Sequence, residues 1–506
     1  MKQILLEGGM VMKKMEADII VVAAGPSGLA ATVQAAELGK KVLTFEKSAV
    51  CGGAANMGMG VFGLNSRIQR ENGQSLDADE AFLKHMNFSH FLIDDTRLVY
   101  DFYRKSGSTI DWLQDMGVNF EYNTFTQYVP ARARHIIQVE LTIHHVLPDG
   151  GGRPGPRAAS AMTRVLIERA KELGAQIHTQ TPVYDLIEED GKIVGVLAKD
   201  KDGEEIEARA KAVIIATGGF GDNPEMIKEA TGYEWGKDLF SFRIPGNVGD
   251  GIKMAWKHGA AKTKTMMELM YQIPDNLNHF VLEGAFRQPV LWVNKLGKRF
   301  FPEDCLGVTS YTGNAISMQP GHTCFTIMDS ATLKYYKKHG VSNPGVHGAD
   351  VFDHFDEAAE AAKAEGYCAY FEADTIEELC EKTGIDLEGL KETLEEYNAD
   401  CEMKYDSVFN KERDYMRPVS KAPFYAIQSF LGAYGTLGGI KINYKTEVLN
   451  EDFKKIPGLY AVGTDAANIY GDTYIFTMPA NTMAFCLNTG RMAAEHAAEY
   501  IDDLEA

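Results

Sequence analysis

Residues 18–28 read Asp18-Ile-Ile-Val-Val-Ala-Ala-Gly25-Pro-Ser-Gly28, an apolar run that ends in a glycine turn. An alanine-rich segment to Gly39 and a second apolar run over residues 41–46 follow it. A continuous apolar run is typical of a buried parallel strand, and a glycine turn entering a helix offers backbone N–H groups to a pyrophosphate. Glu46 ends the second run about 20 residues further on, where a carboxylate can bind a ribose. The pattern predicts a strand–turn–helix–strand site for a dinucleotide.

The first position of this glycine motif is occupied by Ala23, where the usual pattern has a glycine. An alanine fits such a turn when its φ is negative, because positive φ brings Cβ against the backbone. Ala23 is therefore tolerable at this turn if its φ is negative, and it slightly weakens the match to the motif.

Composition restricts the class of protein. The 506 residues are 45% hydrophobic and 24% charged, which is typical of a soluble globular chain, and the length suggests about three domains. A net charge of −20 argues against nucleic acid and anionic membrane surfaces as partners. Seven scattered cysteines without a C-x-x-C pair argue against a metal site or attached haem and favour a reducing compartment. With no signal-like or membrane-spanning apolar run, we expect a cytoplasmic protein.

The order of patterns along the chain predicts a sheet built from both ends. Residues 1–17 read as a dispensable lead-in, and residues 75–125 as helices rich in aromatic side chains. Two apolar runs, at 212–220 and 458–467, end in similar glycine turns and predict neighbouring strands. Further expected elements are a helix over 157–173, a hairpin between 176–183 and 192–198, a helix over 374–405 with Asp374 or Thr375 as its N-cap, and a last helix over 482–500.

Several motifs in this order resemble the fumarate reductase and succinate dehydrogenase flavoprotein superfamily, including the 3-ketosteroid dehydrogenases. They are 23–28 with Glu46-Lys47, Gly52-Gly53, 216–219, 249–251, 293–300, 437–439 and 461–465. The resemblance covers nearly the whole chain and implies an α/β fold. It implies a Rossmann-like FAD-binding domain of the glutathione-reductase type with an inserted α+β capping domain. The expected division is 1–17 extension, 18–274 first part of the FAD-binding domain, 275–430 capping domain, and 431–506 second part.

The resemblance also implies FAD as the cofactor. No histidine occupies the usual attachment stretch, so we expect it to be non-covalent. Cys51 invites a redox role, but a small buried thiol is the simpler interpretation. In the family pattern Glu46 would face the adenosine ribose, and Asp465 would take the place of a glutamate that binds the ribityl chain. The expected FAD-binding residues are Gly25, Ser27, Gly28, Glu46, Lys47, Gly52, Gly53, Ala54, Met57, Gly58, Val183, Ala216, Thr217, Gly218, Asp250, Asp465, Asn481 and Thr482.

The arginines and histidines with which fumarate-type relatives hold a dicarboxylate are missing. The matching positions read Ile273-Pro274, Gly307, Tyr434-Gly435 and Thr477. A dicarboxylate would be buried there without charged partners, which argues against fumarate or succinate. The side chains expected to line the substrate site instead are Met270, Tyr271, Ile273, Tyr434, Tyr474, Phe476 and Met478, and they suit a flat, neutral, aromatic or polycyclic molecule.

A proton must reach the substrate carbon beside the one that exchanges a hydride with the flavin. Tyr474 is the first candidate acid, because it lies near the stretch where ketosteroid dehydrogenases carry a functional tyrosine, and Tyr434 is the second. For each, the alternative is a packed pocket wall. His144-His145 resemble a loop that packs near the flavin in relatives, which implies His145 near the substrate; the alternative is a surface histidine or one that supports the site from outside. Arg132 and Arg134 could orient a carbonyl or phenolate, or belong to a solvated basic loop.

These features predict an FAD-dependent oxidoreductase acting on a small molecule. The preferred reaction is reduction of a carbon–carbon double bond conjugated to a carbonyl, as in steroid enones or plant phenolics, or reductive removal of an activated hydroxyl, as in the similar tetrahydrodaidzein reductases. The alternatives are a desaturating ketosteroid-type dehydrogenase and a non-catalytic flavin subunit that relays electrons. A separate electron donor, either a redox protein, reduced flavin or NAD(P)H, is expected.

Overall fold

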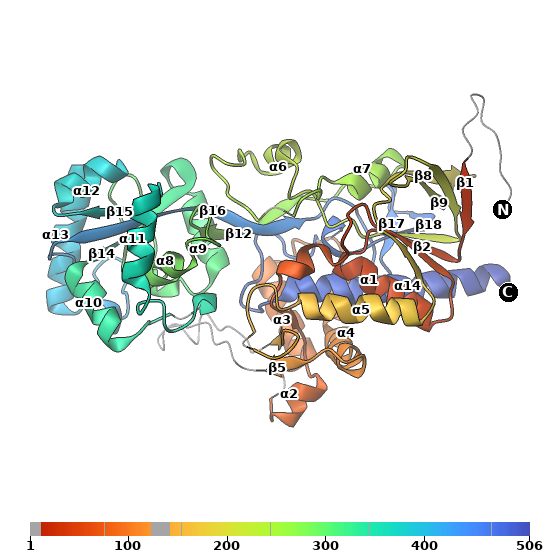
Figure 1. The fold of residues 1–506 in the computed structure, drawn as a ribbon, viewed down its shortest axis with the longest axis horizontal. Coiled ribbons are helices and arrows are strands. Elements are labelled where there is room, and N and C mark those ends of the chain that lie inside the picture. Colours follow the sequence, from red (N-terminus) through yellow and green to blue (C-terminus); the bar gives the residue numbers. More distant parts are fainter. Residues whose placement is uncertain are drawn as a thin grey trace.

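The computed structural model describes residues 12–74, 76–122, 142–152, 154–242, 244–343, 345–466 and 468–506. Arg132 and Arg134 lie outside these residues. The molecule is elongated, with the two chain ends in one half and most of the middle of the chain in the other (Figure 1).

A six-stranded sheet forms the centre of the half that holds both termini. Its order is β17-β18-β11-β2-β3-β7, and all neighbours are parallel except β17 and β18. β18 from the C-terminal region pairs with β11, which pairs with β2 from the N-terminal region, so the expected sheet built from both chain ends is confirmed. The strands are β2 (Ile19–Val22), β3 (Val42–Phe45), β7 (Gln176–His178), β11 (Ala212–Ile215), β17 (Glu447–Leu449) and β18 (Lys455–Ala461).

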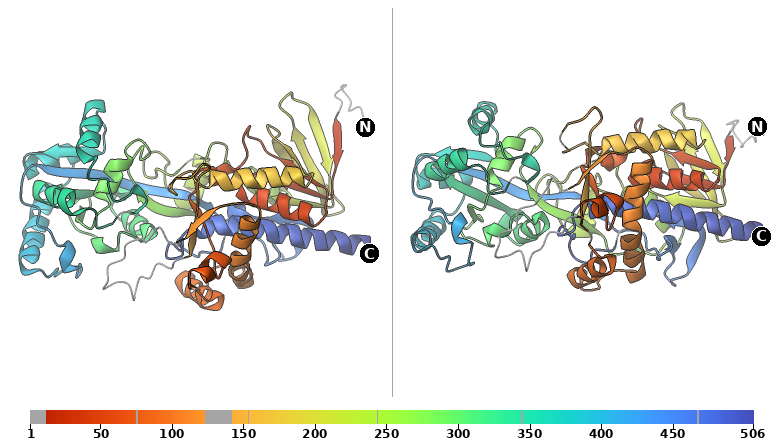
Figure 2. Two further views of the ribbon diagram at one scale, coloured as in Figure 1. Left: turned by 60° about the horizontal axis from the view of Figure 1, so that its bottom comes forward. Right: turned by 90° about the horizontal axis from the view of Figure 1, so that it is seen from below.

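Helices cover one face of this sheet and a second sheet packs near its other face (Figures 1 and 2). The helices are α1 (Pro26–Glu37), α5 (Ser160–Glu172) and α14 (Asn481–Glu505). α14 lies along α1, and Gly490 permits this because a Cβ there would stand 2.2 Å from the Ser27 carbonyl oxygen. The second sheet has the order β1-β10-β9-β8, with β1 (Lys13–Glu16), β8 (Val183–Glu189), β9 (Lys192–Lys199) and β10 (Glu205–Arg209).

Two details of this second sheet differ from the sequence expectation. The hairpin partner of β9 is β8, whereas residues 176–178 join β3 in the central sheet. Residues 13–16 of the expected lead-in form β1, which pairs with β10 in parallel. Both differences are long-range pairings, which a local alternation pattern does not specify.

A third sheet forms the core of the other half. Its order is β12-β16-β14-β13, and β15 also pairs with β16. β16 is 14 residues long and runs from this half into the centre of the molecule, so the boundary expected at residue 430 falls inside a strand (Figure 1). The strands are β12 (Met266–Gln272), β13 (Leu291–Val293), β14 (Thr323–Asp329), β15 (Tyr370–Ala373) and β16 (Phe424–Leu437).

The segment expected as one helix over 374–405 is two helices, α12 (Ile376–Thr383) and α13 (Leu387–Met403). Thr375 caps the first by accepting a hydrogen bond from the Glu378 N–H at 3.1 Å. Gly384 ends it with φ +74°, and Asp386 caps the second at 2.7 Å from the Gly389 nitrogen. A left-handed glycine followed by a capping aspartate stops a helix whose apolar pattern continues.

The remaining helices and strands frame the central region. None of the helices in the described ranges combines the length and apolar character needed to cross a membrane. The remaining helices are α2 (Arg67–Glu71), α3 (Ala78–Ser89), α4 (Thr96–Asp115), α6 (Pro224–Thr231), α7 (Asp250–Lys257), α8 (Phe280–Phe286), α9 (Thr309–Ser317), α10 (Ser330–His339) and α11 (Phe355–Glu365). The remaining strands, β4 (Gly60–Phe62), β5 (Phe120–Tyr122) and β6 (Ile143–Val146), form a small sheet.

The turn after β2 does not meet the condition of a negative φ, because φ of Ala23 is +83°. Two contacts hold the turn. The Ala23 N–H donates to the Phe45 carbonyl at 2.7 Å, and the Ala23 carbonyl oxygen lies so close to α1 that a Cβ on Gly28 would be 2.0 Å from it. Pairing with β3 and packing of α1 therefore keep the alanine in a left-handed conformation.

We expect Ala23→Gly to raise the free energy of unfolding by about 0.5–1 kcal/mol. Relief of the left-handed strain is worth about 1–2 kcal/mol, and the added freedom of the unfolded glycine removes about 0.5–1 kcal/mol of that. Urea unfolding of the FAD-bound protein measures the difference. Ala24→Gly is the matched control: Ala24 is buried and does not have a positive φ, so the same substitution should destabilise there. Equal losses in both variants would contradict the strain interpretation.

Candidate active site

One continuous cavity runs from the carboxyl ends of β2 and β3 to the third sheet. Most of the expected site residues line it. Those at the cofactor end are Gly25, Ser27, Glu46, Lys47, Gly53, Ala54, Met57, Gly58, Val183, Ala216, Thr217, Gly218, Asp250 and Thr482, and those at the substrate end are His145, Tyr271, Tyr434, Tyr474 and Phe476. Gly28, Gly52, Ile273, Asp465, Met478 and Asn481 are expected site residues that do not line it.

The N-terminus of α1 offers a site for phosphate. Gly25 is its N-cap, with an extended backbone and no side-chain hydrogen bond to the first turn. Pro26 at the next position has no N–H, which leaves the following amides to meet a ligand in the cavity. Glu46 is held beside this turn: its two oxygens accept from the Ala24 N–H at 2.8 Å and the Ser48 N–H at 2.7 Å. Its remaining lone pairs can accept from ribose hydroxyls.

Lys47 and Asp250 line the cavity but pair with each other. Lys47 Nζ lies 2.6 Å from Asp250 Oδ2 and also donates to the Gly246 carbonyl. This ion pair joins the end of β3 to the start of α7. The nearby Cys51 is buried, and burial raises the pKa of its thiol to about 11, which favours the simple buried-thiol interpretation over a redox role.

The Asp465 carboxylate points into the protein. It accepts hydrogen bonds from the Gly219 N–H at 2.8 Å, the Gly218 N–H at 3.2 Å and the Thr217 backbone and hydroxyl groups. Asp465 is fully buried. The structure thus places it as a brace for the loop after β11, where the sequence resemblance implied a ligand of the ribityl chain.

We expect Asp465→Asn to lower the free energy of unfolding by about 1.5–3 kcal/mol, because an amide cannot replace a carboxylate that accepts from several donors. Chemical unfolding of protein with and without FAD measures the loss, which should occur in both forms. A loss confined to the FAD-bound form would identify Asp465 as a cofactor ligand. Asp472→Asn, at an exposed aspartate paired with Lys264, is the control and should have little effect.

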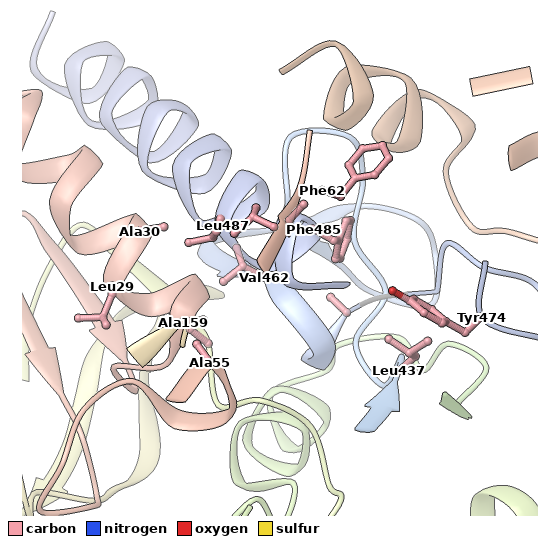
Figure 3. Packing of buried hydrophobic residues seen from close by; sticks show 14 of the residues in the cluster. Leu29, Ala30, Ala55, Phe62, Ala159, Leu437, Val462, Tyr474, Phe485 and Leu487 are labelled. Carbon is pink, nitrogen blue, oxygen red and sulfur yellow. The ribbon is translucent and has the colours of Figure 1, made fainter. Parts of the chain in front are cut away.

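The N-terminus of α14 carries the candidate acid. The helix has no side-chain N-cap of its own. Instead, the Tyr474 hydroxyl accepts from the Asn481 N–H at 3.1 Å and the Thr482 N–H at 3.4 Å. Tyr474 belongs to a buried cluster with Leu437 and Phe485 and is only 4% exposed (Figure 3). Burial raises the pKa of its phenol, so the group is protonated at neutral pH.

Asn481, expected to contact the cofactor, turns its side chain the other way. Its Oδ1 accepts from the Tyr470 hydroxyl at 2.7 Å and its Nδ2 donates to the Tyr103 hydroxyl at 3.1 Å. His85 accepts or donates at the same Tyr103 hydroxyl, 2.6 Å away, and burial lowers the pKa of His85 to about 4. These uncharged side chains of Asn481, Tyr470, Tyr103 and His85 form a hydrogen-bond network that holds the first turn of α14 in place.

Aromatic rings form the walls of the substrate end. Tyr434 stacks between Phe242 and Phe476, with ring centroids 6.1 Å apart in both cases. Its ring is 39% exposed, which distinguishes it from the buried Tyr474. His145 is buried, and burial lowers the pKa of its imidazole to about 4. A planar molecule between these rings would therefore meet neutral side chains.

A polar cluster at the far end of the cavity was not predicted from the sequence. Arg287 Nη2 lies 3.6 Å from Glu283 Oε1 and donates to the Tyr271 carbonyl at 2.8 Å, and His347 Nε2 lies 3.1 Å from Glu283 Oε2. The Tyr271 hydroxyl, Arg287 Nε and His347 Nδ1 are buried without a hydrogen-bond partner. The spacing of Glu283 and Arg287, four residues apart, is the local signal that could have indicated the pair.

Glu268 on β12 is a further cavity residue that the sequence analysis missed. It is 4% exposed, and its carboxyl group hydrogen-bonds the Thr482 hydroxyl. Burial raises the pKa of Glu268 to about 7.

The fold and cavity define a flavin-type dinucleotide-binding oxidoreductase, and comparison with known proteins agrees. Residues 18–475 match the family of the FAD binding domain, and the chain belongs to this family. It is 30% identical to the vinyl phenol reductase of Lactiplantibacillus plantarum over 96% of each chain. It is 27% identical to the NADH:fumarate oxidoreductase of Klebsiella pneumoniae over 97% of this chain and 49% of that protein. The structure of 3-ketosteroid-Δ4-(5α)-dehydrogenase from Rhodococcus jostii RHA1 has a TM-score of 0.73, with 24% identity over 96% of this chain and 97% of that chain.

The protein is therefore an FAD-dependent oxidoreductase of the fumarate reductase-like superfamily. Its cavity fits the cofactor. The first turn of α1 reaches the cavity without a side-chain cap, and helix N-termini favour negative charge. Gly58 lines the cavity beside α14, where a Cβ would stand 2.8 Å from Met483 Cε and 3.3 Å from the Ala55 carbonyl oxygen, so a larger residue would displace the Met483 side chain.

Proposed function

We propose that the protein reduces a carbon–carbon double bond conjugated to an arene or carbonyl in a flat, uncharged phenolic or polycyclic molecule. The observation that carries the proposal is the pairing of two features in one cavity. A buried tyrosine hydroxyl lies at the N-terminus of α14, and unpartnered polar atoms of Tyr271, Arg287 and His347 lie at the substrate end.

The polar cluster supports a substrate with a hydroxyl or carbonyl oxygen. Buried donors and acceptors without partners are costly, so an oxygen of the substrate that reaches them gains their hydrogen bonds. Glu283 and Arg287 balance each other's charge, which favours an uncharged molecule over a dicarboxylate. The aromatic walls of Tyr434 and Phe476 suit a planar ring. The vinyl phenol reductase relative, named for a phenolic alkene, is consistent with this class.

We propose that Tyr474 donates the proton to the substrate carbon and that the polar cluster of Tyr271, Arg287 and His347 binds the substrate oxygen. When bound, reduced FAD would supply a hydride, which is two electrons with one proton, to one carbon of the double bond. Tyr474 gives its phenolic proton to the neighbouring carbon, and the two N–H groups at the start of α14 stabilise the phenolate that forms. Tyr434 and His145 act as walls that orient the ring.

We further propose that residues 18–274 and 431–506 form the FAD-binding domain and residues 275–430 the capping domain, with β1 added to the first. The cofactor-lining residues named above would hold FAD non-covalently, with Glu46 at the adenosine ribose. The chain spans about half of the NADH:fumarate oxidoreductase that it matches. We propose that a separate donor, either reduced flavin, NAD(P)H or a redox protein, reduces the flavin.

An anaerobic titration tests this function. The dithionite-reduced protein is mixed with vinylphenols, steroid enones, phenolic ketones and fumarate, and flavin reoxidation is followed by absorbance. Stoichiometric reoxidation by a phenolic or enone alkene, with saturation of the double bond in the product, is the expected result. Reoxidation by fumarate alone, or by no member of the panel, would contradict the proposal. The oxidised protein mixed with the saturated products tests the desaturating direction in the same way.

Tyr474→Phe should lower turnover by about two to four orders of magnitude, because it removes the proposed acid while the ring still packs. Stopped-flow flavin reoxidation and steady-state assays measure the loss. Tyr460→Phe is the matched control, since Tyr460 is also buried but lies on β18 away from the cavity, and its activity should equal that of the wild type. Unchanged turnover in Tyr474→Phe would remove this residue as the acid.

Tyr271→Phe should raise KM by about 2- to 10-fold for substrates with a phenolic hydroxyl, which corresponds to the loss of one neutral hydrogen bond. Analogues that lack the hydroxyl should show no change, because the Tyr271 hydroxyl has no protein partner to lose. The measurement is KM for pairs of substrates with and without the phenolic hydroxyl. Tyr336→Phe is the control, because Tyr336 is a buried tyrosine that does not line the cavity. An equal increase for both members of each pair would contradict a hydroxyl contact.

A further inference from the structure

Glu268 occupies an irregular position in the third sheet. On β12, Met267 pairs with Thr436 and Leu269 with Ala433, so two residues of β16, Tyr434 and Gly435, lie opposite Glu268. Such a bulge redirects side chains, and bulges are frequent next to active sites. Glu268 lines the cavity and faces Gly435, where a Cβ would stand 3.8 Å from its Oε2. A carboxyl group is thus placed in an otherwise largely apolar part of the active site.

The Thr482 hydroxyl connects this carboxyl group with the proposed acid. Thr482 Oγ1 hydrogen-bonds Glu268 Oε1, and the Thr482 N–H donates to the Tyr474 hydroxyl at 3.4 Å. Against the effect of burial, the Thr482 side chain also lowers the pKa of Tyr474. Thr482 therefore lies between the Glu268 carboxyl group and the phenol, across the first turn of α14, where its hydroxyl can pass a proton from one to the other.

We propose that Glu268 is the proton reservoir that recharges Tyr474 through the Thr482 hydroxyl after each reduction. This inference rests on the proposed function, because it takes Tyr474 as the acid. Glu268 is not a catalytic residue in this proposal, because it acts on the substrate only through Thr482 and Tyr474.

The protons and electrons of this sequence balance. The reduced flavin gives a hydride to one carbon and is oxidised, and Tyr474 gives a proton to the other carbon, so the double bond becomes a single bond. The Thr482 hydroxyl passes its proton to the phenolate while it takes the carboxyl proton of Glu268. The Glu268 carboxylate then takes a proton from solvent, and the site is ready for another turnover.

The surroundings of Glu268 suit this role. The titratable groups that face it are Tyr434 from β16, Tyr470 and Tyr474 from the loop before α14, and Cys486 from α14. All are neutral at pH 7, and burial without a facing cation raises the pKa of Glu268 to about 7. A large part of the Glu268 population is then protonated at neutral pH, whereas an exposed glutamate is almost fully ionised. Because the protonated form is the donor, turnover should fall as the pH rises through about 7.

Glu268→Gln tests the proposal because the amide keeps the shape and a hydrogen bond but cannot release a proton. In stopped-flow experiments on the FAD-bound protein, the first turnover uses the proton already on Tyr474, so its rate should stay within about twofold of the wild type. Steady-state kcat should fall about tenfold or more, and its pH dependence near 7 should disappear. Difference infrared spectroscopy gives a readout other than activity: a protonated carboxyl band that titrates near pH 7 should be present in the wild type and absent in Glu268→Gln.

Variants at Thr482 keep the test decisive if Glu268→Gln folds poorly. Thr482→Val, which breaks the relay but keeps Glu268, should reproduce the fall in kcat, and Thr482→Ser should restore it. Glu495→Gln, at a half-buried carboxylate on α14 that pairs with Lys105 and does not line the cavity, is the control without effect on the pH profile.

An unchanged pH profile in Glu268→Gln or in Thr482→Val would overturn the proposal that Glu268 supplies the proton to Tyr474. It would leave the proposed function intact, because that depends on flavin reoxidation by the alkene and on Tyr474→Phe. A failure of Tyr474→Phe to slow turnover would instead overturn the assignment of the acid itself.

Discussion

The hydrogen bonds of the Asp465 carboxylate join the C-terminal part of the chain to the loop after β11, and the arrangement of the cavity depends on that junction. Asp465 follows β18, and its oxygens accept from the loop after β11, 248 positions earlier in the sequence at Thr217. A buried carboxylate with several donors tolerates little displacement, because any lost bond leaves a charge without compensation. The loop that lines the cavity at 216–218 and the helix that follows β18 therefore keep one relative position. α14 in turn lies against α1 at Gly490, so both helix N-termini are directed to the same cavity.

The third sheet brings the substrate groups to this cofactor region. β16 reaches from the half that holds β13 to β15 into the centre, and β12 pairs with its inner end. A buried ionic cluster stabilises the outer half: Arg299 lies 2.7 Å from Glu303 and 2.8 Å from Asp406, and Lys411 lies 3.6 Å from Glu303. The Arg299 guanidinium and backbone N–H donors hold the pKa of the Asp406 carboxyl below its usual range, against the effect of burial. Charges that are fully paired in this way fix the geometry of the elements that carry them.

Most residues predicted for the cofactor half of the site line the cavity, whereas the prediction for the substrate half covered only its apolar part. Glycine turns, the terminal carboxylate at Glu46 and the strand patterns are local, so each could be recognised within one strand–turn–helix unit. The aromatic walls were expected because Tyr434 stands at, and Phe476 stands beside, a position where fumarate-type relatives carry a charged group. Arg287 and His347 were missed, since neither belongs to a motif and only folding places His347 beside Glu283. The direction of the Asn481 side chain was also not evident, because Tyr103 and Tyr470 approach it from other segments.

The sequence by itself determined the class of cofactor site and the parallel central sheet. By comparison with fumarate-type relatives, it also predicted that the arginines and histidines that hold a dicarboxylate are missing. These follow from short-range patterns: apolar runs that must be buried, glycines where backbones approach, and residue types absent from given positions. Only the tertiary structure decided the left-handed turn at Ala23, the inward direction of Asp465 and the connection from Glu268 to Tyr474. Each of these depends on contacts between segments far apart in the chain, with Glu268 and Thr482 separated by 214 positions. Burial then gives these groups their chemistry, because pKa and hydrogen-bond satisfaction depend on the surroundings that folding creates.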